Sequence, residues 1–111
     1  MLNFEQIIMR NKKTKRIADT IARVRKMEQY FDEILEVMKI GQNILMEDEE
    51  IHKKFQDLVT YYENGQWLQD YECDERGELP GDLKRGVLSE DGLYNLLSDI
   101  ENMKIESYEE L

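Results

Sequence analysis

Apolar side chains recur at helical spacing along most of this chain, and this pattern constrains its fold more than any other feature. In the first half, the stripe consists of Ile17, Ile21, Val24, Met27, Phe31, Ile34, Leu35 and Met38. Its seven-residue period predicts an amphipathic helix with one buried face. The same period fits a coiled coil or a globular helix hairpin, and over this length the hairpin is favoured.

Gly41 is expected to end this helix, because glycine is unfavourable inside a helix and common just after its end. Asn43 would then cap a second helix that ends at Asn64-Gly65. The apolar stripe of this helix consists of Ile44, Leu45, Ile51, Phe55, Leu58, Val59 and Tyr62. Acidic residues at positions 47–50 fall near its start, where the helix dipole favours negative charge.

The next segment predicts a short helix and then a loop. Residues 66–75 carry aromatic and apolar side chains at i, i+1 and i+4, which is the spacing of one helical face. A Gly/Pro cluster at residues 77–81 marks a loop. Residues 82–85 are then expected to form one helical turn that is closed by Gly86.

Ser89 is the predicted N-cap of the last helix, and the two acidic residues after it suit the first turn. Leu88 is expected to pack against Leu93 across this helix start. The stripe of the last helix consists of Leu93, Leu96, Leu97, Ile100, Met103 and Tyr108. No segment shows the apolar-polar alternation of a β-strand.

These patterns predict an all-α fold. Of the 111 residues, 36% are charged, 6 are glycine and 1 is proline, which favours long solvated helices over a turn-rich β-sandwich. We expect a small helical bundle of three main amphipathic helices, with the short aromatic helix and the Gly/Pro loop. Residues 1–16 are expected to form a basic N-terminal arm and residues 17–111 the helical domain. Apolar surface left over could be shared with a second copy in a homodimer.

Cysteine usage and hydropathy indicate the compartment. Cys73 is the single cysteine, which excludes an intramolecular disulfide and every multi-thiolate zinc site. The basic residues near the N-terminus follow the first apolar residues, whereas a secretory signal has the opposite order. No stretch approaches the roughly 18 apolar residues of a transmembrane helix. We therefore predict a cytoplasmic protein with no transmembrane segment.

Part of the chain resembles a known family. Within residues 61–97 it contains the runs YYENGQWLQDYE, GELP and LKRGVLSEDGLYNLL. These resemble the bacterial domain-of-unknown-function family 4298, with a resemblance that extends over residues 23–103. It implies a small, mostly helical cytoplasmic protein with no assigned activity. The chain departs from the family pattern at Cys73, where a small residue such as alanine is expected, and at its N-terminus, which resembles an added arm. The departure at Cys73 argues against a shared thiol mechanism.

The region between the short aromatic helix and the last helix is the predicted partner surface. Its candidate residues are Trp67, Asp70, Tyr71, Lys84, Arg85 and Tyr94. Aromatic side chains with polar tips are enriched in protein interfaces, and they also close the ends of small cores. Arg85 is expected to pair with Asp70 or Glu72. We predict a helical interaction module or small adaptor that presents residues 67–94 to an unknown protein partner.

The N-terminal arm is a predicted anion-binding segment. Its candidate residues are Arg10, Lys12, Lys13, Lys15 and Arg16. Residues 1–27 hold 8 basic and 2 acidic residues, a net +6, and residues 28–111 hold 7 and 23, a net −16, which sum to −10. Such an arm could bind nucleic acid or an anionic membrane surface, or it could lie against its own acidic body or that of a second copy. Binding of nucleic acid or an anionic surface is the alternative to the adaptor function.

Catalytic and metal-binding patterns are scarce. An acidic run with the spacing of the first ligands of a calcium loop consists of Asp70, Glu72, Asp74 and Glu75. The rest of that pattern is missing, since the sixth position is not glycine and the twelfth, Gly81, is not glutamate. His52 has no second His or Cys for a ligand set, and the acidic neighbours of Cys73 would raise the pKa of its thiol. We predict no cofactor, no metal site and no catalytic residue, and hence no enzyme.

Overall fold

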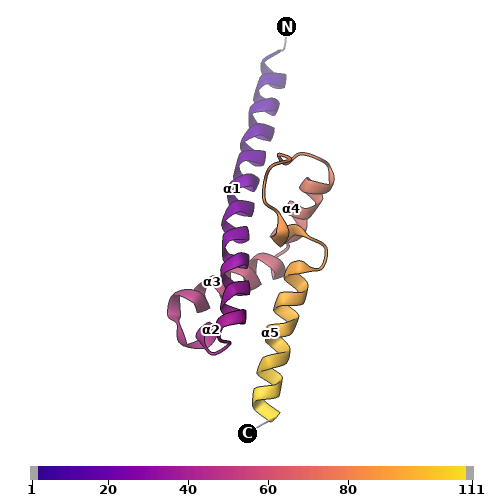
Figure 1. The fold of residues 1–111 in the computed structure, drawn as a ribbon. Coiled ribbons are helices and arrows are strands. Elements are labelled where there is room, and N and C mark those ends of the chain that lie inside the picture. The colour runs from indigo at the N-terminus through magenta and orange to yellow at the C-terminus, as the bar shows by residue number, and fades with distance from the viewer. Residues whose placement is uncertain (1–2, 110–111) are drawn as a thin grey trace.

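Every regular element in the described part of the chain is helical (Figure 1). The computed structural model describes residues 3–109, and side chains through Met103, so residues 1–2 of the predicted arm and the side chain of Tyr108 lie outside it. In chain order the elements are α1 (Phe4–Ile40), α2 (Ile44–Glu47), α3 (Glu49–Glu63), α4 (Gln66–Glu75), the 3-10 turn η1 (Gly86–Leu88) and α5 (Gly92–Glu109). The predicted all-α class is confirmed.

The first helix is longer than its apolar stripe predicts. α1 has 37 residues and begins in a capping box, in which the Asn3 side chain accepts from the N–H of Gln6 at 2.8 Å and the Gln6 side chain accepts from the N–H of Asn3 at 3.1 Å. It ends at Gly41, as predicted. The predicted boundary after residue 16 falls inside α1. Residues 4–16 are therefore a helical extension, which we call the arm helix.

The predicted second helix is in fact two helices. Between α2 and α3, Asp48 has an extended backbone, and its Oδ1 accepts a hydrogen bond from the N–H of Ile51 at 3.1 Å. The side chain of Asn43 makes no capping hydrogen bond. The prediction that Asn43 caps one continuous helix is wrong, because the Asp48 carboxylate caps the N–H of Ile51 in the first turn of α3 and the extended backbone of Asp48 separates the two helices. The predicted end at Asn64 is confirmed.

The segment before α5 also differs from its prediction. Residues 82–85 form no helix, and the single turn is η1, directly after them. Glu28 of α1 fixes this position, since its Oε2 accepts a hydrogen bond from the N–H of Val87 at 2.8 Å. The hydroxyl of Ser89 accepts a hydrogen bond from the N–H of Gly92, the first residue of α5, at 3.2 Å. The hydroxyl of Ser89 thus caps an N–H at the start of α5, but the helix begins later than predicted, so the two acidic residues after Ser89 precede its first turn.

The core forms along the part of α1 that follows the arm helix. Its buried apolar residues are Val24, Met27, Phe31, Ile34, Val37, Leu45, Phe55, Leu58, Tyr61, Cys73, Leu79, Leu83, Val87, Leu88, Leu93, Leu96 and Ile100. Most of them belong to the predicted stripes. α5 starts close to Phe31 and then extends toward the end of the molecule at which α1 ends (Figure 1).

The molecule is elongated, with extents of 70 × 23 × 22 Å. Its radius of gyration is 17.6 Å, whereas a compact domain of this length has about 13 Å. The arm helix contributes to this shape, because it extends past α4 and the loop that follows (Figure 1) and none of its residues is buried. The fold therefore separates the basic arm helix from the rest of the helical domain.

Candidate functional site

A buried carboxylate joins three helices. The side chain of Asp70 in α4 is 1% exposed. It accepts hydrogen bonds from Nε and Nη2 of Arg23 in α1, at 2.9 and 2.6 Å, and from the hydroxyl of Tyr61 in α3, at 2.7 Å. Nε2 of Gln66 lies 3.4 Å from Oδ1. We call these four residues the polar junction.

The polar junction is closed to acid-base chemistry. The hydrogen bond that Arg23 donates to Asp70 raises the pKa of the Arg23 guanidinium. Burial, and then Asp70, raise the pKa of Tyr61, so both donors keep their protons at neutral pH. A general base needs a carboxylate oxygen within reach of a substrate proton, and both oxygens of Asp70 are occupied by these donors. The geometry instead ties α1, α3 and α4 together.

This arrangement corrects two predictions. Asp70 was expected on an accessible partner surface, and that prediction is wrong because its side chain is buried under Arg23 and Tyr61. Arg85 pairs with Asp74 and also donates to the carbonyl oxygens of Pro80 and Leu83. It does not pair with Asp70 or Glu72, because it reaches α4 one turn later than expected.

Trp67 holds η1 against α4. Its indole N–H donates to the carbonyl oxygen of Val87 at 2.8 Å. Its ring stacks on Tyr71 with a centroid distance of 5.2 Å and meets Tyr62 at 5.4 Å. Trp67 and Tyr71 are half-buried. The structure therefore brings these two predicted site residues together, in contacts that close one end of the core.

Glu28 is a buried acid that the predicted site did not include. Its side chain is 8% exposed, and it accepts the N–H of Val87. Burial raises the pKa of this carboxyl, while the N–H groups of Val87 and Gly86 and the exposed Lys84 act in the opposite direction. A Cβ on Gly86 would lie 3.0 Å from Oε1, so Glu28 and η1 fit together closely. The sequence did contain a signal for this buried acid, because Glu28 lies one helical turn after Val24, within the apolar stripe of the first helix.

Two residues of the acidic run, and Cys73, are also occupied by internal contacts. Asp70 and Asp74 form ion pairs with Arg23 and Arg85. Among the described residues, no group of three His, Cys, Asp or Glu side chains is placed to hold a metal ion. The thiol of Cys73 donates a hydrogen bond to Oε2 of Glu78 at 3.3 Å. The pKa of this thiol is raised by burial and then by Glu78, and not by the acidic residues next to it in sequence, as was expected.

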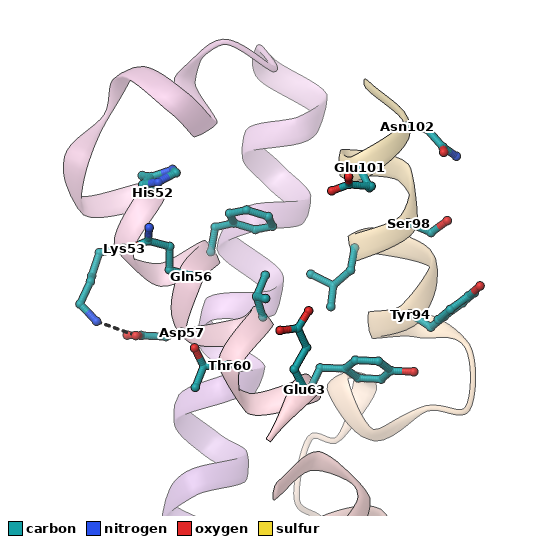
Figure 2. A pocket seen from close by; sticks show the side chains of 14 residues that line it. His52, Lys53, Gln56, Asp57, Thr60, Glu63, Tyr94, Ser98, Glu101 and Asn102 are labelled. Atoms are coloured by element: carbon teal, nitrogen blue, oxygen red, sulfur yellow. Dashed lines mark hydrogen bonds and ion pairs between the residues drawn. The ribbon is translucent and has the colours of Figure 1, made fainter. Parts of the chain in front are cut away.

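An open groove of about 1030 Å³ lies between α3 and α5 (Figure 2). Its apolar lining consists of Phe55, Val59, Tyr62, Tyr94 and Leu97. Phe55 is buried at its base, whereas Tyr94 is 56% exposed at one end. Tyr94 is the one predicted partner-surface residue that lines this groove. The groove is therefore apolar in its floor and open to solvent.

The edges of the groove are acidic. Glu63 of α3 and Glu101 of α5 point into the space between the two helices (Figure 2). Within the part of the chain whose side chains are described, neither of them forms an ion pair, whereas Asp57 is paired with Lys53 at 2.6 Å. Two unpaired carboxylates flanking an apolar floor form a site that favours a cationic, apolar ligand.

The arm helix has two chemically different sides. At about 100° per residue, Phe4, Ile7, Ile8, Lys12 and Lys15 share the side opposite to buried Val24. We call these five residues the outer face. Arg10, Lys13 and Arg16 lie nearer the side that is buried further along α1. All five predicted anion-binding residues are exposed, and so are Phe4 and Ile7, at 76% and 43%.

The comparisons with known proteins agree with the resemblance. A family model described as a domain of unknown function (DUF4298) matches residues 24–109. No curated protein and no solved structure matches the chain. The family match starts within α1, after the arm helix. Of the helices in residues 3–109, none combines the length and apolar character needed to cross a membrane.

Proposed function

We propose, from the premise that the chain belongs to the family described as a domain of unknown function (DUF4298), that this protein is an interaction module that binds an amphipathic basic helix. The ligand helix would lie in the groove between α3 and α5. One observation carries the proposal: the groove has an apolar floor and unpaired acidic edges that face solvent. We also place the module in the cytoplasm, because a free thiol such as that of Cys73 fits a reducing compartment.

The two walls of the groove suit a helical ligand. A helix binds in such a groove by inserting apolar residues at i, i+3, i+4 and i+7. The floor residues Val59, Tyr62 and Leu97 would receive these apolar residues, while Glu63 and Glu101 would attract lysines beside them.

The proposal moves the partner surface to the edge of the predicted region of residues 67–94, because Tyr94 is the one residue of that region that lines the groove. Trp67 and Arg85 are engaged in internal hydrogen bonds, so replacing them would disturb the fold. Tyr94 is more than half exposed and lines the groove, which makes it the predicted surface residue best placed to contact a partner. The adaptor function is therefore assigned to the side of α5 that faces α3, instead of the loop before it.

A synthetic helix made only of leucine and lysine tests the proposal. We expect it to bind the full-length chain, and we expect the same design with glutamate in place of lysine not to bind. Glu63→Lys and Glu101→Lys should each weaken binding of the leucine-lysine helix at least about tenfold, because each reverses a charge at the groove edge. Isothermal titration calorimetry at low salt measures both affinities.

Asp99→Lys is the matched control. Asp99 is an exposed acid on α5, two residues before Glu101, and it does not line the groove. This variant changes the net charge equally, so it should retain binding within about twofold. Equal losses for Glu101→Lys and Asp99→Lys would show that only the overall acidity attracts the peptide, and would contradict the groove as the binding site.

A further inference from the structure

We infer that the helix that occupies this groove is the arm helix of a second copy of the chain, so that two copies form a symmetric dimer by exchanging arm helices. This inference rests on the proposed function of the groove. It names the partner by residues within the chain itself, and it also assigns a role to the exposed outer face of the arm helix.

The outer face of the arm helix has the chemistry that the groove requires. Phe4, Ile7 and Ile8 have i, i+3, i+4 spacing, and Phe4 and Ile7 are exposed, so their apolar surface has no cover within the monomer. Lys12 and Lys15 continue the same face over the next turns. A ligand helix with this face would place three apolar side chains on the groove floor and two ammonium groups near its acidic edges.

Length and charge also match. The outer face extends from Phe4 to Lys15, and the α3 wall of the groove extends from His52 to Glu63, so each covers eleven residue steps or about 17 Å. The arm helix carries five basic residues and one acidic residue, a net +4, whereas residues 28–111 carry a net −16. Long-range attraction therefore favours the approach of an arm helix to the body of another copy.

The fold prevents a copy from filling its own groove. The arm helix belongs to the continuous α1, whose 37 residues correspond to about 56 Å. The arm helix lies at one end of α1, whereas α3 and α5, whose residues line the groove, lie toward its other end (Figure 1). Two elongated copies placed side by side in opposite directions would bring each arm helix to the groove of the other. A two-fold axis then makes both contacts identical, as in a closed dimer.

Reversed charges provide the test. One full-length variant carries Lys12→Glu and Lys15→Glu in the arm helix, and the other carries Glu63→Lys and Glu101→Lys in the groove. Sedimentation equilibrium should show the wild-type chain as a dimer and each variant alone with a dimer dissociation constant raised at least about tenfold. Mixed in equal amounts, the variants should form a heterodimer of near wild-type affinity, because both arm-groove contacts are then between opposite charges.

A face control separates docking from general electrostatics. Arg10→Glu with Lys13→Glu makes the same change in net charge on the other side of the arm helix, and this variant should keep the wild-type dimer within about threefold. Circular dichroism establishes that every variant retains its helical content.

Several results would overturn the inference. One is a wild-type chain that stays at monomer mass up to about 100 µM. Another is a pair of monomeric variants that fail to associate when mixed. A third is that the two variants with reversed charges in the arm helix bind duplex DNA or anionic vesicles equally well, while the chain stays monomeric. If the leucine-lysine helix still binds the groove of a monomeric chain, the proposed function stands and only the second copy is excluded as its partner.

Discussion

The polar junction and the α3–α5 groove use carboxylates in opposite ways. At the junction, the oxygens of Asp70 accept hydrogen bonds from an arginine and a tyrosine, and the side chain is 1% exposed. At the groove, Glu63 and Glu101 point into open space between two helices (Figure 2). The first carboxylate is satisfied within the chain, whereas the other two remain able to bind a cation. Satisfaction of hydrogen bonds, rather than residue type, thus distinguishes the structural acid from the candidate binding acids.

Arg23→Ala should have the largest effect on stability. It removes the cation from Asp70 and leaves a buried carboxylate without its main donor, which typically costs about 3–5 kcal/mol. Urea unfolding followed by circular dichroism measures the change. Asp70→Asn in the Arg23→Ala background should recover part of the loss, because it removes the uncompensated charge. A loss below about 1 kcal/mol for Arg23→Ala would contradict the structural role of the junction.

Trp67→Ala tests whether Trp67 and the rings that it contacts, Tyr62 and Tyr71, stabilise the fold or form part of the binding surface. Loss of the stacked ring and of the hydrogen bond to Val87 should lower the free energy of unfolding by about 2–3 kcal/mol, less than for a fully buried tryptophan. Trp67→Phe, which removes the N–H but keeps a ring, should cost about 0.5–1.5 kcal/mol. The affinity of the folded protein for the leucine-lysine helix should change less than about twofold. A stable variant that no longer binds would instead place Trp67 in the binding surface.

The sequence predicted the helices well because their stripes have one period. Gly41 and Asn64 also marked helix ends correctly, since each acts on the backbone within a few residues. Asn43 was misassigned because Asp48, five residues later, is a second residue able to cap a helix, and its carboxylate caps α3. Local signals therefore suffice where one residue dominates and fail where two compete.

The site was less predictable because its contacts are distant in sequence. Asp70 meets Arg23 across 47 residues and Glu28 meets Val87 across 59. Neither pairing has a local signature, so Asp70 was assigned to the nearby Arg85. The groove is harder still, since Val59, Tyr62 and Leu97 looked like ordinary members of their stripes. Their partial exposure follows from the spacing between α3 and α5, which the stripes do not encode.

Glu28 is a second buried acid, and it should make the stability of the fold depend on pH. Glu28→Ala should lower the free energy of unfolding by about 1–3 kcal/mol at neutral pH, because the N–H of Val87 loses its acceptor. Glu28→Gln keeps an acceptor and removes a buried charge, so it should be at least as stable as wild type at pH 7. Burial raises the pKa of Glu28 in the folded state, so the folded protein takes up a proton before the unfolded chain does.

The sign of that dependence is specific. As pH falls through the raised pKa toward the ordinary value of 4.5, wild type gains stability relative to Glu28→Gln, and the difference between them shrinks. Urea unfolding of both proteins at several pH values measures it. If the stability of Glu28→Gln relative to wild type instead grew as the pH fell, the fold would stabilise the charged form of the Glu28 carboxylate. Glu28 would then resemble Asp70 in the polar junction, whose charge is compensated by its donors.

Tyr94→Ala should have the smallest effect on stability and thereby sharpens the comparison most. Its side chain is 56% exposed and makes no hydrogen bond within the described residues, so the free energy of unfolding should change by less than about 0.5 kcal/mol. Binding of the leucine-lysine helix should nevertheless weaken about tenfold, because an aromatic side chain at the end of an apolar groove is a typical anchor. Arg23→Lys, which keeps the charge at the junction, should weaken the fold and leave that affinity unchanged. Opposite responses of the two variants in the two assays would separate the region that holds the helices together from the region that binds, whereas a joint loss of stability and binding on Tyr94→Ala would show that the two regions are energetically one.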